Sequence, residues 1–359
     1  MEASSAPRIT VVIPTLNEER TIGASIDSVL DQDVAAGELE LLVVDGGSED
    51  GTRGVVERIA SESPVSIRVL DNPGRTVPSA LNVALREARG SYLVRVDGHS
   101  EPTRDYVRTC VAANDAHDAD LAGGWVEARG DGLIGGAVAA AFASGVSMGN
   151  PASWSRPSTP REVASVPCGS YRIEALRAIG GFDEEQAANQ DYEANYRLRQ
   201  AGGRVVLIPD VWFGYRTRSS LRSLARQFTR YGFYKARVMV KHPASIRARH
   251  LVPAAGLLVL IALIVAAPFA GAARWLVVAC ACVYVVVILA ATLILRRRAG
   301  RSTIALPVVF AVMHLSWAVG NVAGLARWVP AAGRIRRTRA SVVGVPRPEP
   351  GRTEGEVHP

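Results

Sequence analysis

Four short apolar runs alternate with helix-like patterns along the first 100 residues of the chain. The runs occupy residues 9–15, 39–45, 65–70 and 92–97. None of them alternates strictly between apolar and polar residues, which is typical of strands buried on both faces of a parallel sheet. Between the first two runs, apolar residues recur at helical spacing, and Asn17 stands where a helix N-cap is expected. The pattern therefore predicts an α/β fold built around a parallel sheet.

Polar side chains follow each of the four predicted strands. In chain order they are Thr15, Asn17 and Glu18, then Asp45, then Asn72 and Arg75, and finally Asp97 and His99. In an open parallel sheet, ligands bind beyond the carboxyl ends of the strands. Four polar strand ends at one edge therefore predict a single binding site. Carboxylates there can hydrogen-bond a ribose or a base, or hold a divalent cation that bridges a diphosphate.

The stretch Asp97-Gly98-His99 ends the fourth run with an oxygen ligand and a nitrogen ligand on either side of a glycine. A turn is the ordinary interpretation, because aspartate and glycine are common in turns. The neighbouring strand ends favour a second interpretation. In it, Asp97 and His99 bind a cation, and Gly98 lets the backbone approach a phosphate.

The pattern becomes irregular after residue 120. Residues 130–165 are rich in Gly, Ala, Ser and Pro, which predicts a loop or cover. A Gly-Gly-Phe-Asp turn at 180–183 precedes a predicted helix that opens with two acids, Asp191 and Glu193. Acids in the first turn of a helix are favoured by the helix dipole, so the pair alone is compatible with a structural role.

Three apolar segments follow His250. Residues 251–273 and 275–295 contain no acid and are each long enough to span a hydrocarbon core, which predicts a membrane hairpin. A third candidate, 304–329, is diluted by glycines and polar residues, and we expect it to be re-entrant or interfacial. The tail, 331–359, is predicted to be basic and then disordered.

The net charge of +7 hides an asymmetry between the two halves of the chain. Residues 1–210 carry 31 acidic and 19 basic side chains, whereas residues 211–347 carry 21 basic and no acidic ones. The basic segment 216–250 contains interleaved aromatic residues and runs directly into the apolar segments. It therefore predicts an amphipathic helix on an anionic membrane surface rather than a nucleic-acid site.

Several classes of protein lack their signatures in this chain. It contains neither a GxGxxG nor a Walker loop, which argues against dinucleotide binding and P-loop hydrolysis. A sugar-1-phosphate nucleotidyltransferase would need a lysine in its phosphate loop, and no lysine precedes Lys235. A transporter or scaffold with a degenerate head would not be expected to keep four polar strand ends. The four cysteines form no CxxC pair and no secretory signal is seen, so we expect a reduced, cytoplasmic head.

Six segments together resemble the family 2 glycosyltransferases, which have the GT-A fold. In chain order they are VVIPTLNEE (11–19), LLVVDGGSEDGT (41–52), VRVDGHS (94–100), GGFDEE (180–185), NQDYEANYRLRQAG (189–202) and QFTRY (227–231). The resemblance covers about residues 8–235 and is greatest to membrane-attached enzymes of exopolysaccharide assembly of the succinoglycan type. It implies a nucleotide-sugar-binding domain over residues 1–215, followed by the basic segment and a membrane region over 251–330.

The resemblance also implies roles for individual residues. Those that would line the nucleotide-sugar pocket are Pro14, Thr15, Asn17, Glu18, Asp45, Arg75 and Asp97. Asp97 and His99 would occupy the DxD position that binds Mg²⁺ or Mn²⁺, and a histidine suits Mn²⁺ better. Asp191 would be the general base, and the residues near the acceptor and the diphosphate would be Gln227, Arg230 and Tyr231. Tyr231 replaces the tryptophan of the family's motif, which argues against processive synthesis.

The implied reaction is a single displacement that inverts the anomeric carbon. A hexose would pass from a nucleotide sugar, which we expect to be a UDP-hexose, to a hydroxyl of a polyprenyl-diphosphate-linked saccharide in exopolysaccharide synthesis. The rival is a polyprenyl-phosphate hexose synthase, whose acceptor is the lipid phosphate and which needs no strong general base. In both cases we expect a multi-pass protein of the cell membrane whose catalytic domain lies in the cytoplasm.

Overall fold

The computed structural model describes residues 7–97, 100–144, 146 and 152–335. Within these residues, a nine-stranded sheet forms the centre of the head, and its main path runs β3-β2-β1-β4-β8-β6-β9-β5. The first four strands, all parallel, are β1 (Ile9–Thr15), β2 (Leu39–Asp45), β3 (Ser66–Asp71) and β4 (Tyr92–Arg95). The parallel α/β arrangement predicted for the first 100 residues is confirmed.

The sheet becomes mixed beyond β4. The remaining strands are β5 (Ser100–Pro102), β6 (Leu121–Arg129), β7 (Arg161–Glu162), β8 (Ser170–Arg172) and β9 (Val205–Arg216). β8 runs antiparallel to both β4 and β6. β6 and β9 are parallel to each other, and β5 and β7 each pair with β9 in the antiparallel direction. The antiparallel β8 brings the residues just before it to the carboxyl end of β4, where ligand-binding residues are expected.

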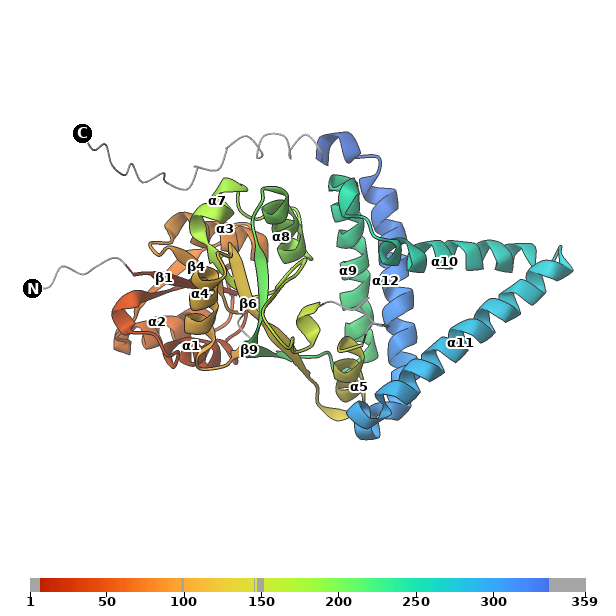
Figure 1. The fold of residues 1–359 in the computed structure, drawn as a ribbon, viewed down its shortest axis with the longest axis horizontal. Coiled ribbons are helices and arrows are strands. Elements are labelled where there is room, and N and C mark those ends of the chain that lie inside the picture. The colour runs from red at the N-terminus through yellow and green to blue at the C-terminus, as the bar shows by residue number, and fades with distance from the viewer. Residues whose placement is uncertain (1–6, 98–99, 145, 147–151, 336–359) are drawn as a thin grey trace, which may run out of the picture.

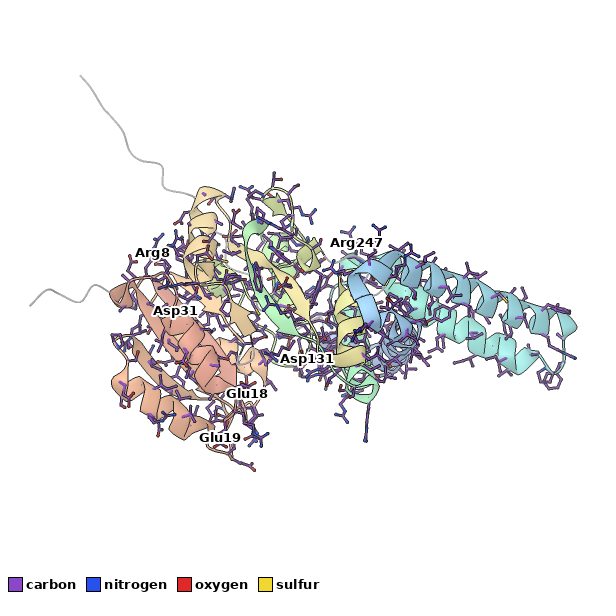
Figure 2. The ribbon with its side chains drawn as sticks, turned by 90° about the horizontal axis from the view of Figure 1, so that it is seen from below. Arg8, Glu18, Glu19, Asp31, Asp131 and Arg247 are labelled. Carbon is purple, nitrogen blue, oxygen red and sulfur yellow. The ribbon has the colours of Figure 1, made fainter. Side chains whose placement is uncertain are left out.

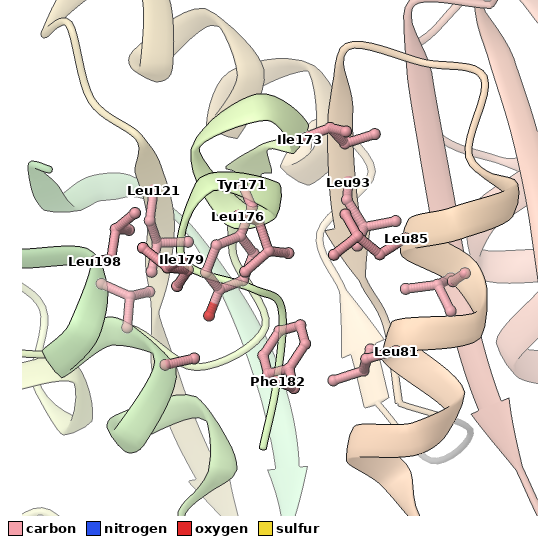
Figure 3. Packing of buried hydrophobic residues seen from close by; sticks show 14 of the residues in the cluster. Leu81, Leu85, Leu93, Leu121, Tyr171, Ile173, Leu176, Ile179, Phe182 and Leu198 are labelled. Carbon is pink, nitrogen blue, oxygen red and sulfur yellow. The ribbon is translucent and has the colours of Figure 1, made fainter. Parts of the chain in front are cut away.

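Helices cover both faces of the sheet. One face carries α1 (Ile22–Leu30), α2 (Thr52–Glu62) and α4 (Tyr106–Ala116), and the other carries α3 (Val77–Glu87), α7 (Ile173–Ala178) and α8 (Gln190–Gln200). Figure 3 shows the second face, where the Phe182 ring lies between Tyr171 and Leu81. The ring centroids of Phe182 and Tyr171 are 5.8 Å apart. Strands buried on both sides explain why the apolar runs do not alternate.

Helix α5 (Gly132–Phe142) occupies part of the stretch that the composition predicts to be a loop. It packs against α11, α12 and the short helix between them, and Phe142 is buried with its ring 4.8 Å from that of Trp154. The loop prediction for residues 130–165 is therefore wrong over this helix. Its residues are apolar on all sides and three of them are glycines, so neither periodicity nor propensity signals a helix.

Helices α9 (Leu221–Lys241) and α12 (Leu306–Trp328) lie side by side along the head (Figure 1). The backbones meet closely, because a Cβ on Gly232 of α9 or on Gly320 of α12 would lie 2.1 or 2.0 Å from a carbonyl oxygen of the other helix. Asn321 is buried and donates a hydrogen bond to the carbonyl of Gly232 at 3.2 Å. The small residue Gly320 and the polar residue Asn321 therefore face α9.

The apolar side of α9 is covered by protein rather than left open. Phe228 and Met239 are buried, and Phe233 and Tyr234 contact Trp328 of α12 with ring centroids 5.4 and 6.5 Å apart. The predicted amphipathic helix is present, but its aromatic side chains serve first to bind another helix of the same chain. This contact could not be predicted from the sequence pattern, because α9 and α12 are far apart in the chain.

Helices α10 (Ala248–Ala266) and α11 (Gly271–Ala299) project away from the head as a hairpin (Figure 1). By length and composition α10 and the stretch Gly271–Trp328 could each cross a membrane. The turn of the hairpin lies at 267–270, before the boundary at residue 274 that the apolar runs predict, because Pro268 disfavours continuation of α10. A short 3₁₀ helix, η4 (Gly300–Ala305), then leads into α12.

Candidate active site

The loops after β1 and β2 are tied together. Thr15 and Asp45 are register partners at the ends of these strands, and buried Asp45 accepts a hydrogen bond of 2.6 Å from the Ser48 hydroxyl. Asn17 has a left-handed backbone (φ 55°) and bridges to the second loop. Its N–H donates to the Ser48 hydroxyl at 2.9 Å, and its side-chain oxygen accepts from the N–H of Glu49 at 2.8 Å. The two strand ends therefore form one surface.

Asn17 does not cap a helix, so that expectation is wrong. Helix α1 begins later, with Thr21 as its N-cap residue. Glu18 lies between Asn17 and α1. Its carbonyl accepts a hydrogen bond from the backbone N–H of Thr21 at 2.9 Å, and its own N–H donates to the Thr52 hydroxyl at 2.8 Å. Its carboxylate accepts a hydrogen bond from Thr15 at 3.2 Å.

The remaining nucleotide-pocket candidates lie at the same edge. Pro14 precedes Thr15 in β1 and is half-buried. Arg75 follows β3 in a left-handed conformation (φ 52°). Its exposed guanidinium lies against Gly47 in the loop after β2 and 3.8 Å from the Glu49 carboxylate. Figure 2 shows this end of the head at Glu18, opposite Arg8 at the start of β1. The structure thus brings together the candidates of three strand ends, as the parallel sheet predicts.

Asp97 follows β4 and is paired with an arginine from the strand itself. The Arg95 Nε and Nη2 atoms donate to the two carboxylate oxygens of Asp97 at 2.6 and 3.1 Å. The Cys168 thiol, which precedes β8, lies 3.7 Å from the same carboxylate. Burial alone would lower the pKa of Arg95, but the charge of Asp97, with smaller contributions from Cys168 and Asp191, raises it well above its usual range. Burial and the charge of Asp97 also raise the pKa of Cys168, which keeps the thiol protonated.

Of the two metal-ligand candidates, the structure describes Asp97, whereas His99 and the intervening Gly98 lie outside the described residues. Among the residues that the structure describes, no group of three His, Cys, Asp or Glu could hold a metal ion by itself. A cation bound largely by the phosphates of a substrate needs only one or two carboxylates from the protein. The partly exposed Asp97 carboxylate at the strand end fits such an ion, which would share it with Arg95.

Asp191 stands in the first turn of α8, and its carboxylate accepts the backbone N–H of Tyr192 at 2.8 Å. The charge of Asp191 acts on Arg95 at the end of β4, on Cys168 just before β8, and on Tyr231 of α9. The side chain of Asn189, two residues earlier, donates to the carbonyl of Tyr231 at 3.1 Å and so holds the start of α8 against α9. Asp191 and Asp97 are therefore close enough for their charges to act on the same groups, although 94 positions separate them in the chain.

The three acceptor-side candidates on α9 make different contacts. The Gln227 amide donates to the hydroxyls of Tyr215 and Tyr231 at 2.7 and 3.1 Å. Its side-chain oxygen is buried and has no hydrogen-bond partner among the described residues. The Arg230 guanidinium donates to the carbonyl of Ala187 at 2.7 Å, just before α8. All three thus lie along the side of α9 that meets α8 and the site.

Glu193, the second acid of the pair, is fully buried away from these residues. Its carboxylate accepts from Arg197 at 2.8 Å and lies 2.9 Å from the Lys241 ammonium and 2.8 Å from His242 Nε2. Lys241 also contacts Asp183 of the GGFDEE segment at 2.5 Å. Burial would raise the pKa of Glu193, but His242, Arg197 and Lys241 hold it far below its usual range. This network joins α8, α9 and the 180–185 turn.

We expect Glu193→Gln to destabilise the fold more than it impairs chemistry. Loss of one partner from a buried ion network costs about 3–5 kcal/mol, which corresponds to a melting temperature lower by roughly 10 °C. The matched control is Glu57→Gln, which removes an exposed pair with Arg53 at the same spacing of four residues and should change the melting temperature little. Thermal unfolding of the full chain in detergent measures both. Equal, small shifts would contradict the structural role.

Sequence reasoning missed Arg95, Cys168 and Lys235. A charged residue inside an apolar strand is a usable signal for Arg95, because buried charges need partners. Cys168 gives no such signal, since its contact with Asp97 spans 71 positions. Lys235 lies within a run of ten basic residues at 216–249, where nothing in the sequence separates a buried cation from exposed ones.

Comparisons with known proteins show the family of the chain. The profile of the family described as "Glycosyl transferase family 2" matches residues 10–175. A relative from Rhizobium meliloti (strain 1021), "Succinoglycan biosynthesis protein ExoA", is 34% identical over 248 residues, which make up 68% of this chain and 74% of the relative. "Glycosyltransferase AglE" from Haloferax volcanii is 25% identical over 225 residues, or 63% of this chain and 72% of that protein.

A solved structure of similar shape is the mannosyltransferase PcManGT from Pyrobaculum calidifontis, in complex with GDP-Man and Mn²⁺. The two chains superpose with a TM-score of 0.61 at 22% identity, over 89% of this chain and 88% of the other. At that identity the likeness shows the GT-A fold alone. The fold, the profile match and the 34% identity to a relative covered over 74% of its length show that this chain belongs to glycosyl transferase family 2 and is a glycosyltransferase.

Proposed function

We propose that this enzyme transfers a hexose from a nucleotide sugar to a hydroxyl of a membrane-associated, polyprenyl-diphosphate-linked saccharide, with inversion of the anomeric carbon. The observation that carries the proposal is the convergence of Asp97, Asp191 and Tyr231. The charge of Asp191 acts both on Arg95, the partner of Asp97, and on Tyr231 of α9. The carboxylate proposed for the donor and the one proposed for the acceptor would then share a site beside α9, against which Asn189 holds the start of α8 at 3.1 Å.

The strand ends are proposed to bind the donor. The residues concerned are Pro14, Thr15, Asn17, Glu18, Asp45, Arg75 and Asp97. The likeness to a mannosyltransferase solved with GDP-Man and Mn²⁺ supports a nucleotide sugar and a divalent cation as ligands, and we propose UDP-hexose with Mn²⁺ or Mg²⁺. When bound, the cation would neutralise charge on the leaving diphosphate. Asp97, and His99 by the sequence pattern, would hold it.

Asp191 is proposed as the general base that takes the proton of the acceptor hydroxyl. A two-step route would need a nucleophile near the anomeric carbon. Cys168 lies beside Asp97, but its thiol is buried and directed at that carboxylate at 3.7 Å. We therefore propose a single displacement, and with it inversion.

The membrane is proposed as the location of the acceptor. The hairpin of α10 and α11 begins seven residues after the end of α9. One side of α9 packs on α12, and another side contacts the start of α8, where the Asn189 side chain donates to the carbonyl of Tyr231. Relatives that include a succinoglycan biosynthesis protein support a surface or exopolysaccharide saccharide as the product. The active site would then stand at the level of the lipid head groups.

We expect the hairpin to cross the membrane twice and α12 to stay with the head. The basic residues Arg296–Arg301 and Arg334–Arg339 both favour the cytoplasm, and only an even number of crossings allows this. A reporter fused after residue 345 should therefore lie in the cytoplasm, whereas one inserted after residue 270 should lie outside. A reporter after residue 345 that is found outside would instead demonstrate three crossings.

The transferase proposal is tested with the full chain in detergent, a panel of UDP- and GDP-sugars, and Mn²⁺ or Mg²⁺. The readout is release of the nucleoside diphosphate on addition of prenyl-diphosphate-linked saccharides, followed by determination of the anomeric configuration. Transfer with inversion to a saccharide hydroxyl is the expected result. Transfer to the phosphate of a prenyl monophosphate, with no reaction on the linked saccharides, would overturn the proposal.

A further inference from the structure

Helices α8 and α9 meet along a polar seam that begins next to the catalytic-base candidate. Lys235 of α9 and His242, which directly follows α9, lie on the side that faces α8. The Lys235 ammonium is 3.3 Å from the ring centroid of Tyr192, the residue after Asp191, and His242 contacts Glu193. The seam thus leads from Asp191 along α9 toward the start of α10.

Lys235 is a buried cation without an anionic partner. The residue is 8% exposed. Within the described part of the chain its ammonium makes no hydrogen bond and no ion pair, and its contact is the face of Tyr192. Burial and the charge of Arg249 lower the pKa of Lys235 to about 7, and only the charge of Asp191 opposes them. A cation–π contact offsets part of the desolvation of a buried ammonium, but an anion would offset far more.

Lys241 provides the contrast on the same helix. It is equally buried, yet its ammonium contacts Asp183 at 2.5 Å and Glu193 at 2.9 Å. Protein carboxylates therefore neutralise Lys241, which links α8, α9 and the 180–185 turn. Lys235, beside Tyr192, has no such carboxylate among the described residues, so a ligand could neutralise it.

Three arginines also act on the same ring. The charges of Arg199, Arg249 and Arg247 all act on Tyr192, and Arg249 also acts on Lys235. The Arg199 guanidinium is held within α8 and by the neighbouring loop, because it lies 5.7 Å from the Tyr196 ring centroid and donates to the carbonyl of Ala164 at 3.1 Å. Arg247, just before α10, and Arg249, in its first turn, are exposed, and Figure 2 shows Arg247 at the base of the helix hairpin. The charges that remain for a ligand near Tyr192 are thus those of Lys235, Arg247 and Arg249, with Asp191 as the neighbouring carboxylate. Such a cluster suits an anion that carries more than one negative charge.

We propose that Lys235, Arg247 and Arg249 bind the phosphate groups of the lipid-linked acceptor. This inference rests on the proposed function for the position of the membrane. There the start of α10 stands at the level of the lipid head groups, and the prenyl diphosphate of an acceptor enters at the same level. Phosphates held beside Tyr192 would present the attached saccharide to Asp191. The donor diphosphate is assigned to the strand ends, on the other side of Asp191.

The test is direct binding of farnesyl diphosphate to the full chain in detergent, measured by calorimetry. Lys235→Met keeps the length of the side chain and removes the charge, and it should weaken binding by about tenfold, the scale of one charge-assisted hydrogen bond. Arg249→Gln, at an exposed position that tolerates change, should weaken it in the same direction. Arg226→Met removes an exposed charge from the same helix and should leave binding unchanged. Melting temperatures verify that each variant is folded.

Three other ligands separate the sources of phosphate. Farnesol lacks the diphosphate, so the native chain and Lys235→Met should bind it with the same affinity. Binding of UDP or GDP, which reports the donor site, should also be unaltered, as should binding to phosphatidylglycerol vesicles, which reports general attraction to anionic lipid. The inference is overturned if farnesyl diphosphate binding survives both Lys235→Met and Arg249→Gln. It is also overturned if UDP, GDP or vesicle binding falls to the same extent. Because this experiment measures binding and not turnover, its result does not depend on whether the transferase assay succeeds.

Discussion

Replacement of Asp191 by asparagine is expected to lower kcat by about 10²- to 10⁴-fold, the usual contribution of general-base catalysis. Asparagine keeps the shape of the side chain, and its oxygen can still accept the N–H of Tyr192, as the carboxylate does at 2.8 Å. Donor affinity should change little, because the nucleotide is assigned to the strand ends. Release of nucleoside diphosphate at saturating donor and acceptor measures the turnover.

Glu193→Gln is the paired variant, since it changes the other acid of the same helical turn. Per folded molecule, its turnover should stay near the native value because Glu193 contacts Arg197, Lys241 and His242 rather than the site. Normal turnover of Asp191→Asn with loss of turnover in Glu193→Gln would mean that the wrong carboxylate is assigned. If both variants remain active, the acceptor is a phosphate, and the polyprenyl-phosphate hexose synthase is the better interpretation.

The parallel half of the sheet could be predicted because each strand is a separate apolar run. Strands β1, β2 and β4 are buried on both faces, the edge strand β3 is partly buried, and helical periodicity separates the four. The mixed half offers no such pattern. β7 and β8 are two and three residues long, and their pairing with β9 and β4 depends on contacts across distant parts of the chain. Strands this short carry too little periodicity to be recognised.

Local signals failed where tertiary contacts override them. Asn17 has the chemistry of a helix cap, but its side chain and backbone bind the loop that follows β2 instead. Helix α5 has the composition of a loop, but its small residues allow close packing against α12. In both cases the deciding partner lies far away in the sequence.

The candidate site could be predicted as a set of positions but not as a set of contacts. Asp45 and Asp97 follow strands that are parallel, so their nearness follows from the fold class alone. The pairing of Asp97 with Arg95 and Cys168 requires β8 to lie beside β4, which no pattern in the sequence indicates. The different roles of Asp191 and Glu193 likewise depend on the side chains of α9 near each of them, which are Tyr231 for Asp191 and Lys241 for Glu193.

Removal of divalent cations is expected to abolish transfer, and Asp97→Ala to lower kcat by roughly 10³-fold or more, because a bound cation stabilises developing charge by several kcal/mol. The structure adds a condition. Both oxygens of Asp97 already accept hydrogen bonds from Arg95, at 2.6 and 3.1 Å, so a cation must share this carboxylate. We therefore expect Mn²⁺ to bind weakly to the protein alone and more tightly when UDP or GDP supplies phosphate oxygens.

Calorimetric titration of Mn²⁺ with and without the nucleotide measures this coupling, and turnover in excess chelator measures the requirement. The control is Asp31→Ala, because Asp31 is an exposed aspartate away from the Glu18 end of the head (Figure 2) and should leave turnover and Mn²⁺ binding unchanged. From the sequence pattern, His99→Ala should weaken activity and shift the preference between Mn²⁺ and Mg²⁺. Full activity in excess chelator would show that Asp97 serves the donor without a cation. In that case the Arg95 guanidinium, which is held beside Asp97, would supply positive charge to a leaving diphosphate.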